Sequence, residues 1–512
     1  MSLEPSRTRL VMPQSIGAVS DGWDTDSAHV AQNHIIHTTY EPLTNPSIAI
    51  DERGVRRPVA SELLPRLAES WQGSPDTRSW TVRLRAGVRS DHGHQLTAED
   101  VRWSWERAYA LRRVGRWRSR RMAGVAEATD VHVVDERTLR FDLRRPNPEF
   151  PQYLIFSTNQ VFDSTEARRH ATDDDPWATA WLSRNPAGFG AFALERQADD
   201  VLELRARDEY WAGRPGIDAL LQVGVETREQ ALTLVERGEA NCLLGLYPEE
   251  LARFDGRPEY TLHRVRANHS TIEFDYTQPP FDDQRLRQAI CFALPYARIL
   301  DDVYRGHAQQ SRSPVTSVSH HHAPELWHYD TDLARARELV AASDYADGVE
   351  TELYIDPTYE SLRFVDLVLP ALAAIGVRAE ARLLRWPDPV SAIGRRPPMW
   401  FKHDCGHALP EALYDLGHDY DPPMGIHGGL FLRDGKLAQR IQAAATAEVG
   451  EQAAGYRNLQ HEILDLAYCA HVAEHETGWV FRGKIDPWVL SEDCLVVKTA
   501  VWSTHRNILN TW

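Results

Sequence analysis

The chain has 512 residues, of which 42% are hydrophobic and 26% charged, the composition of an ordinary globular protein. Its formal net charge of −17 argues against nucleic acid as a partner, because phosphate binding needs concentrated positive charge. No apolar run approaches the ~18–20 residues of a membrane-spanning helix. The five cysteines include no C-x-x-C pair, and their odd number is not that of a disulfide framework.

The N-terminal segment, MSLEPSRTRLVMPQ, lacks the apolar stretch and the small-residue cleavage site of a secretory signal. It also lacks the cysteine at which a processed lipoprotein would begin. Two interpretations stay open: an export signal has been removed, or the protein remains inside the cell.

In the first half of the chain, short strands alternate with amphipathic helices, which predicts an α/β or α+β protein. Residues 80–88, WTVRLRAGV, alternate apolar and polar side chains and predict a half-buried strand. Residues 96–110 predict a helix, in which Thr97 and Asp100 have the spacing of a capping box. Residues 131–148 predict a hairpin that ends at prolines.

The second half is more helical. Asp282 or Asp283 can cap a helix, and Pro295 suits the first turn of the next one. Residues 329–345 predict an amphipathic helix that begins after an N-cap at Asp330. These signals concern folding and indicate no chemistry.

Five segments, read in order, carry a recognisable pattern: 40–44 (YEPLT), 67–108, 185–220, 279–300 and 329–345. Together they resemble the bacterial extracellular solute-binding proteins of ABC importers, the oligopeptide-, dipeptide- and nickel-binding family (family 5). The block at 67–108 is the most characteristic, and the resemblance extends over nearly the whole chain.

The resemblance implies a large, type II periplasmic-binding-protein-like α/β fold with two lobes, a hinge and an additional domain on lobe I. Such proteins enclose their ligand in a cleft between the lobes. The implied bounds are 1–40, 186–262 and 480–512 for lobe I, 41–185 for the additional domain and 263–479 for lobe II.

The resemblance also implies a place for the ligand. Peptide-binding members pair the extended peptide with their own strands, and an acidic residue of the second lobe neutralises the peptide ammonium, which is costly to bury unpaired. Asp404, after Trp400, is the candidate carboxylate in this chain, and His407 stands where a second acidic residue is common. The alternative is that Asp404 caps a turn.

Aromatic side chains supply rigid contact area in such clefts. The candidates are Tyr276, Trp386 and Trp400 in the second lobe, and Tyr40 and Phe189 in the first. Each could instead belong to a hydrophobic core.

Histidine is concentrated in two places, HDCGH at 403–407 and SHHHAPELWH at 319–328. Imidazole and thiolate can bind zinc or nickel, but neither C-x-x-C nor H-E-x-x-H is present, so we predict no metal site and no cofactor. His403 and His407 are instead candidate ligand contacts. Neighbouring histidines in extended chain point to opposite sides and do not converge on one ion.

The sequence thus predicts a receptor, not an enzyme, that passes a peptide or similar small polar solute to an ABC permease. We expect a monomer outside the cytoplasm, in the periplasm or anchored at the cell surface, with no nucleic-acid partner. The alternative is an intracellular enzyme or ligand-sensing module on the same scaffold, which the unpaired cysteines favour. A metal-storage or metal-sensing protein is a third possibility.

Overall fold

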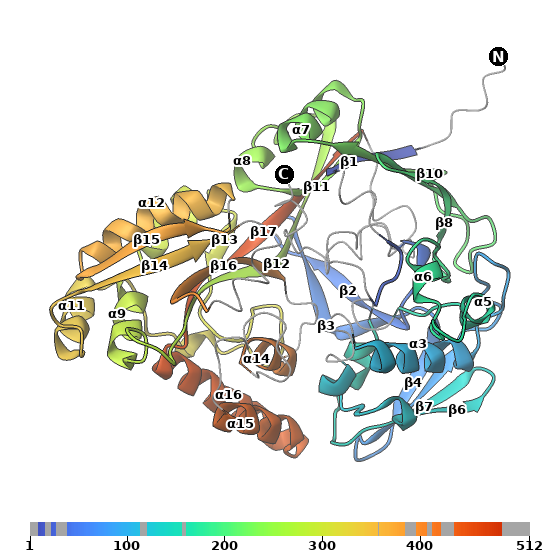
Figure 1. Ribbon diagram of the computed structural model, residues 1–512, viewed down its shortest axis with the longest axis horizontal. Coiled ribbons are helices and arrows are strands. Elements are labelled where there is room, and N and C mark those ends of the chain that lie inside the picture. The colour runs from blue at the N-terminus through green and yellow to red at the C-terminus, as the bar shows by residue number, and fades with distance from the viewer. Residues whose placement is uncertain are drawn as a thin grey trace. The chain divides into compact units, whose positions relative to one another are not determined.

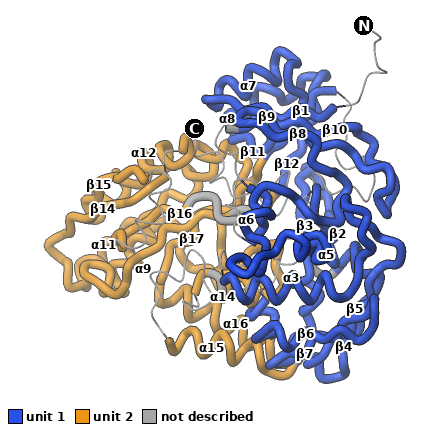
Figure 2. Tube along the Cα trace, turned by 45° about the vertical axis from the view of Figure 1, so that its right-hand side comes forward, with its two compact units in different colours: residues 1–265, 478–512 blue, residues 266–477 orange. Residues whose placement is uncertain are grey.

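The structure is a computed structural model, described at residues 9–15, 22–26, 38–112, 120–155, 160–356, 358–384, 396–406, 412–420 and 435–483. The chain divides into two units, unit 1 (Met1–Val265 and Gly478–Trp512) and unit 2 (Arg266–Thr477), coloured separately in Figure 2. It passes between them within strands β12 (Tyr260–Phe274) and β17 (Cys469–Arg482). The lobe boundaries given above stay a prediction.

Unit 1 contains two four-stranded sheets (Figure 1). The first has the order β1-β10-β9-β8, with β1 (Arg9–Ser15) parallel to β10 (Ala219–Val225) and β9 (Val201–Ala206) antiparallel to β10 and to β8 (Phe192–Ala198). The second is antiparallel, with the order β4-β5-β7-β6. Its strands are β4 (Ala68–Gly73), β5 (Ser79–Leu84), β7 (Thr138–Asp142) and β6 (Val131–Asp135).

Three local predictions for unit 1 are confirmed. In β5, Val82 and Leu84 are buried whereas Thr81 and Arg83 are exposed, so the alternation of apolar and polar residues sets the faces of the strand. Strands β6 and β7 form the predicted hairpin. Helix α3 (Ala98–Leu111) begins at the predicted capping box, where the backbone N–H of Thr97 donates to Asp100 Oδ2 at 2.8 Å.

Further strands and helices complete unit 1. The remaining strands are β2 (Thr44–Ile50), β3 (Val55–Pro65) and β11 (Cys242–Leu246). The remaining helices are α5 (Ser164–Arg169), α6 (Thr179–Leu182), α7 (Arg228–Arg237) and α8 (Pro248–Leu251).

Unit 2 is built on strands in the order β17-β12-β16-β14-β15. Strand β14 (Val349–Ile355) is parallel to β15 (Val377–Leu383) and to β16 (Met399–Gly406), and β16 is antiparallel to β12. Helix α12 (Tyr359–Ala373) lies along this sheet in Figure 1. The other elements are β13 (Ala308–Gln310), α9 (Gln284–Ala293), α10 (Tyr296–Arg298), α11 (Leu333–Ala342), α14 (Ala412–Tyr420), α15 (Gly435–Thr446) and α16 (Val449–Leu466).

One face of the sheet in unit 2 packs into a hydrophobic core. Ile272 of β12, Ile355 of β14 and Phe401 of β16 are fully buried there. Phe364 of α12 stacks on Phe401 with ring centroids 3.7 Å apart, which fixes the helix on this face.

Of two helix caps predicted in unit 2, one is confirmed and the other is wrong. Asp283 caps α9 as predicted and accepts from the N–H of Arg285 at 2.8 Å. The prediction of Asp330 as the cap of α11 is wrong, because Asp332 occupies that position. Thr331 Oγ1 donates to the carbonyl of Leu294 and Asp332 N to that of Phe292, so tertiary contacts keep the chain extended for two further residues.

Among the described residues, no helix has both the length and the hydropathy needed to cross a membrane.

Candidate functional site

The second face of the sheet in unit 2 carries buried polar side chains. Because Ile272 and Phe274 of β12 enter the hydrophobic core, the residues that alternate with them lie on the opposite side. We call this side the polar face, made by His269, Thr271 and Glu273 of β12 and by Trp400 and Lys402 of β16. All five residues are buried, and the pairing of Thr271 with Lys402 and of Glu273 with Trp400 sets them side by side.

Lys402 is the centre of an ionic cluster on the polar face. Its Nζ lies 2.8 Å from Asp419 Oδ1, on α14, and 3.2 Å from Glu273 Oε1. His269 Nε2 lies 3.5 Å from the other oxygen of Asp419. A buried ammonium without a counter-charge would be costly, so the two carboxylates account for a lysine that is only 2% exposed.

Two carboxyl groups of unit 2 have perturbed acidity. Burial raises the pKa of Glu273 to about 7, although the ammonium of Lys402 acts in the opposite direction. Burial alone raises the pKa of Asp356 to about 7. Asp356 directly follows β14, and no described residue pairs with its carboxyl group. Ligands of open α/β sheets bind at such carboxyl ends of strands.

Strand β16 has a β-bulge beside the polar face. His269 pairs with Cys405 and Thr271 with Lys402, so the single residue Ser270 opposes both His403 and Asp404. Bulges re-aim side chains and are frequent next to binding sites. Two predicted ligand contacts, His403 and Asp404, therefore occupy an irregular point of the strand, although their side chains lie outside what the structure describes.

A thiol lies near the ionic cluster but is not activated. Cys469 Sγ is 3.1 Å from Tyr420 OH and 3.5 Å from His471 Nε2. Burial raises the pKa of Cys469 well above its usual range, so the neutral thiol is favoured over the nucleophilic thiolate. Within the described parts of the chain, no group of three or more His, Cys, Asp or Glu residues is arranged to hold a metal ion.

Two other predicted contacts of unit 2, Trp400 and Tyr276, pack against different hydrophobic neighbours. Trp400 packs with Leu384 and Tyr354, whereas Tyr276 packs against Tyr468 with centroids 4.8 Å apart. Trp386 and His407 lie outside the described residues. Trp400 and Tyr276, both predicted as ligand contacts, therefore belong to different clusters of side chains.

Tyr40 and Phe189 are fully buried in unit 1. The OH of Tyr40 donates to the carbonyl of Trp23 at 3.2 Å and accepts from the N–H of Ala187 at 3.3 Å. A Cβ at Gly188 would lie 2.4 Å from the carbonyl oxygen of Thr39, so glycine allows these two segments to pack. Both aromatic residues therefore hold unit 1 together, and contact with a ligand stays a prediction.

The histidines of SHHHAPELWH contact several different groups, and the rings of His320 and His321 also lie next to each other, with centroids 6.4 Å apart. The ring of His321 packs on Tyr456, with centroids 5.2 Å apart. His322 Nδ1 lies 2.6 Å from the carbonyl oxygen of Val315, and the ring of His328 packs on Tyr329. The carbonyl of His321 accepts from Gln460 of α16, which fastens the loop to that helix.

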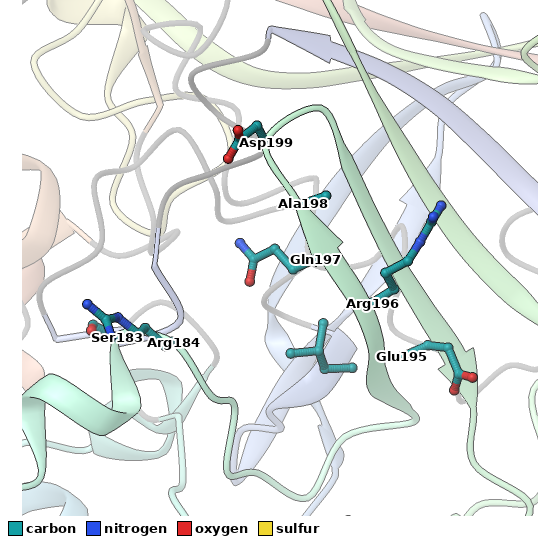
Figure 3. A pocket seen from close by; sticks show the side chains of 8 residues that line it. Ser183, Arg184, Glu195, Arg196, Gln197, Ala198 and Asp199 are labelled. Atoms are coloured by element: carbon teal, nitrogen blue, oxygen red, sulfur yellow. The ribbon is translucent and has the colours of Figure 1, made fainter.

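A surface hollow of about 440 Å³ lies in unit 1 (Figure 3). Gln197 of β8 points toward Ser183 and Arg184, whereas Arg196 points away. Gln197 Oε1 already accepts from Trp23 Nε1 at 2.7 Å. The other lining residues are Leu194, Glu195, Ala198 and Asp199. Their mixed charges and their exposure select no class of ligand.

The ionic cluster was not predicted from the sequence. Its members come from β12, β16 and α14, and no short motif joins Glu273, Lys402 and Asp419. One signal was present: the chain has only four lysines, against 57 lysines and arginines together, and Lys402 lies two residues before the candidate Asp404. Lysine is a compact charge that suits a confined site better than the broad fork of arginine.

Comparison with known proteins defines the class. Solved structures of periplasmic solute-binding proteins share the fold: DppA from Helicobacter pylori in complex with peptide STSA has a TM-score of 0.79 at 19% identity, covering 94% of this chain and 96% of that one. MoaA in complex with mannopinic acid, from A. tumefacien R10, has a TM-score of 0.76 at 21% identity, covering 94% and 95%. The α/β fold class is confirmed.

Residues 62–419 match the bacterial extracellular solute-binding proteins, family 5 Middle, and the chain belongs to this family, as predicted. Heme-binding protein A of Haemophilus influenzae is 24% identical over 64% of this chain and 63% of its own length. Di/tripeptide-binding protein 2 of Pseudomonas aeruginosa is 25% identical over 71% and 70%. The chain thus spans roughly two thirds of these relatives, and less than two thirds of the first.

Proposed function

We propose that this protein is the solute-binding receptor of an ABC importer and that it captures a peptide or a similar small polar solute. Membership of family 5 and the names of relatives that bind di- and tripeptides, heme and glutathione support this proposal. A receptor role requires a site for polar groups, and the polar face of unit 2 is the observation that carries it. The alternative, an intracellular enzyme or sensor, is not favoured.

The solute contacts proposed on β16 are Trp400, His403 and Asp404. The bulge at His403 and Asp404 interrupts the ladder, so at that point the strand can turn backbone and side-chain groups toward a ligand. Trp400 offers a rigid aromatic surface beside them. Tyr276, Trp386, His407, Tyr40 and Phe189 remain candidates on the family resemblance alone.

The proposal includes a partner and a location. The receptor works outside the cytoplasm as a monomer and delivers its solute to a permease of the inner membrane. It performs no chemistry on the solute. Membership of family 5 supports these statements.

Native mass spectrometry of the purified protein, followed by thermal shift with di- and tripeptides, tests the proposal. A peptide at 100 times its dissociation constant stabilises the folded protein by about 2.7 kcal/mol. Asp404→Asn should raise the dissociation constant at least about tenfold, because it removes a charged partner of the solute. Asp347→Asn, at an exposed carboxylate of unit 2, is the matched control.

A protein that binds no peptide, and whose native mass shows no carried solute, would contradict the receptor proposal. A native mass that reveals a metal chelate would keep the receptor but change its solute. Equal affinities of the Asp404→Asn and Asp347→Asn variants would remove Asp404 from the site.

A further inference from the structure

Arg287 of α9 is buried, and its guanidinium donates hydrogen bonds to backbone carbonyl groups. Nη1 donates to the carbonyl of Phe281 at 2.7 Å, Nη2 to that of Leu466 at 2.6 Å and Nε to that of Ala467 at 3.1 Å. Leu466 and Ala467 form the C-terminal end of α16, where a cation is favoured by the helix dipole. A side chain that is only 4% exposed is therefore held by groups of two different segments.

Two glutamines of α9 strengthen the same attachment. Gln284 Nε2 and Gln288 Nε2 each donate to the carbonyl of Asp465 at 2.7 Å. Gln284, Arg287 and Gln288 have the spacing that places side chains on one face of a helix, and this face covers the last carbonyl groups of α16. The position of the Arg287 guanidinium is fixed as a result.

Two tyrosine rings lie beside the fixed guanidinium. Cζ of Arg287 is 5.8 Å from the ring centroid of Tyr276 and 6.0 Å from that of Tyr468. The two centroids are 4.8 Å apart, and the rings are inclined at 53°. Both distances are within the range in which a guanidinium attracts an aromatic ring. Tyr468 is only 7% exposed, whereas Tyr276 is partly exposed.

We propose that Arg287 is a positioning residue of the solute site. It holds the ring of Tyr276 against Tyr468, and the exposed part of that ring offers a fixed surface to an apolar side chain of the solute. A ring that is ordered before binding loses less conformational entropy when the solute arrives. The inference rests on the proposed function and adds a class of solute, peptides with an aromatic or aliphatic side chain.

Arg287→Lys keeps the positive charge but removes the planar fork that reaches several carbonyl groups at once. The ring of Tyr276 is then less well fixed, and the affinity for the tripeptide Ala-Phe-Ala should fall about fivefold. Arg285→Lys is the matched control, because Arg285 lies on the same helix with 44% of its side chain exposed. Its affinity should equal that of the unmodified protein.

Isothermal titration calorimetry with Ala-Phe-Ala in a double-mutant cycle tests whether Arg287 acts through Tyr276. Tyr276→Ala removes the ring and should lower the affinity about tenfold. Arg287→Lys made in the Tyr276→Ala protein should then change the affinity by less than about twofold, because the ring that Arg287 positions is gone. A merely structural role of Arg287 would lower the affinity equally in both backgrounds.

A second variant keeps the test independent of how Arg287→Lys folds. Tyr468→Leu leaves the guanidinium in place and removes the ring against which Tyr276 packs. It should lower the affinity for Ala-Phe-Ala when Tyr276 is present and leave it unchanged in the Tyr276→Ala protein. Circular dichroism establishes that each protein used in the cycle is folded.

Equal losses in the two backgrounds overturn the inference, and so does an unchanged affinity of Tyr276→Ala; the receptor function stands in both cases. Failure of the unmodified protein to bind Ala-Phe-Ala also overturns the inference. The receptor proposal falls only if the di- and tripeptides of the thermal-shift experiment fail to bind as well.

Discussion

Unit 1 and unit 2 each bury an ionic cluster, and the two clusters differ in how completely their polar atoms are paired. In unit 1, the carboxylate of Glu41 accepts from Arg66 Nε at 2.8 Å, from Tyr210 OH at 2.9 Å and from Trp211 Nε1 at 2.9 Å. Arg66 also lies over the ring of Trp211. Both carboxylate oxygens of Glu41 therefore accept hydrogen bonds from side chains of unit 1.

In unit 2, Lys402 faces two carboxylates, burial favours the protonated form of Glu273, and Thr271 Oγ1 has no partner among the described residues. The first cluster uses arginine, whose planar fork matches a carboxylate, and the second uses lysine, a point charge. A fully paired buried cluster stabilises a fold and has nothing left for a ligand. An incompletely paired one retains capacity for binding at the expense of stability.

The largest expected effect comes from breaking the paired cluster. Glu41→Ala leaves the guanidinium of Arg66 buried without its partner and should lower the free energy of unfolding by about 3–5 kcal/mol. Urea denaturation followed by circular dichroism measures it. Glu69→Ala, which removes an exposed pair with Arg83, should cost no more than about 1 kcal/mol. Equal losses in the two variants would mean that burial of the Glu41 cluster contributes nothing.

The sequence predicted what is encoded locally. The strand at β5 and the capping box of α3 depend on residues within a few positions of one another, and both were found. The cap of α11 was misplaced because the carbonyl groups of Phe292 and Leu294, some 40 residues away, hold the chain extended there.

The candidate site could be predicted only in part, for the same reason. Asp404 and His403 are neighbours in the sequence, so a local pattern could propose them as contacts and they remain predictions, but Lys402 and its partners meet only after β12, β16 and α14 have assembled. At the bulge, Ser270 of β12 lies opposite two residues of β16. This arrangement depends on the register of the two strands, which the residue types alone do not define.

The second prediction concerns the pH dependence of stability, which Glu273 gives to the ionic cluster of unit 2. The pKa of Glu273 is about 7 in the folded protein and near its ordinary value of 4.5 when unfolded, so the folded state favours the proton. This contribution to stability is present at low pH and is lost as pH rises through 7, by up to about 3 kcal/mol between pH 4 and pH 8.

Glu273→Gln removes this dependence and should make unfolding at pH 8 more costly, by about 2–3 kcal/mol relative to the unmodified protein, with little gain at pH 5. Urea titrations at the two pH values give the comparison. A variant that is destabilised equally at both would show that Glu273 is ionised in the folded protein and stabilises it through Lys402.

The smallest effects distinguish a paired hydroxyl from an unpaired one. Tyr210→Phe deletes an OH that donates to Glu41 and accepts from Arg66 at 2.9 Å, and should cost about 1.5–3 kcal/mol. Thr271→Val replaces the unpaired Oγ1 with a methyl group of the same shape and should change stability by less than about 1 kcal/mol, in either direction.

Calorimetry with the solute completes this test, because the two hydroxyl groups differ in purpose. Thr271→Val should weaken solute binding while leaving the fold nearly as stable, whereas Tyr210→Phe should weaken the fold and leave binding unchanged at temperatures where it stays folded. If Thr271→Val costs as much stability as Tyr210→Phe, its hydroxyl group has a partner within the folded chain. The polar atoms of the polar face would then be hydrogen-bonded as completely as those of the Glu41 cluster. The two units would no longer differ in this respect.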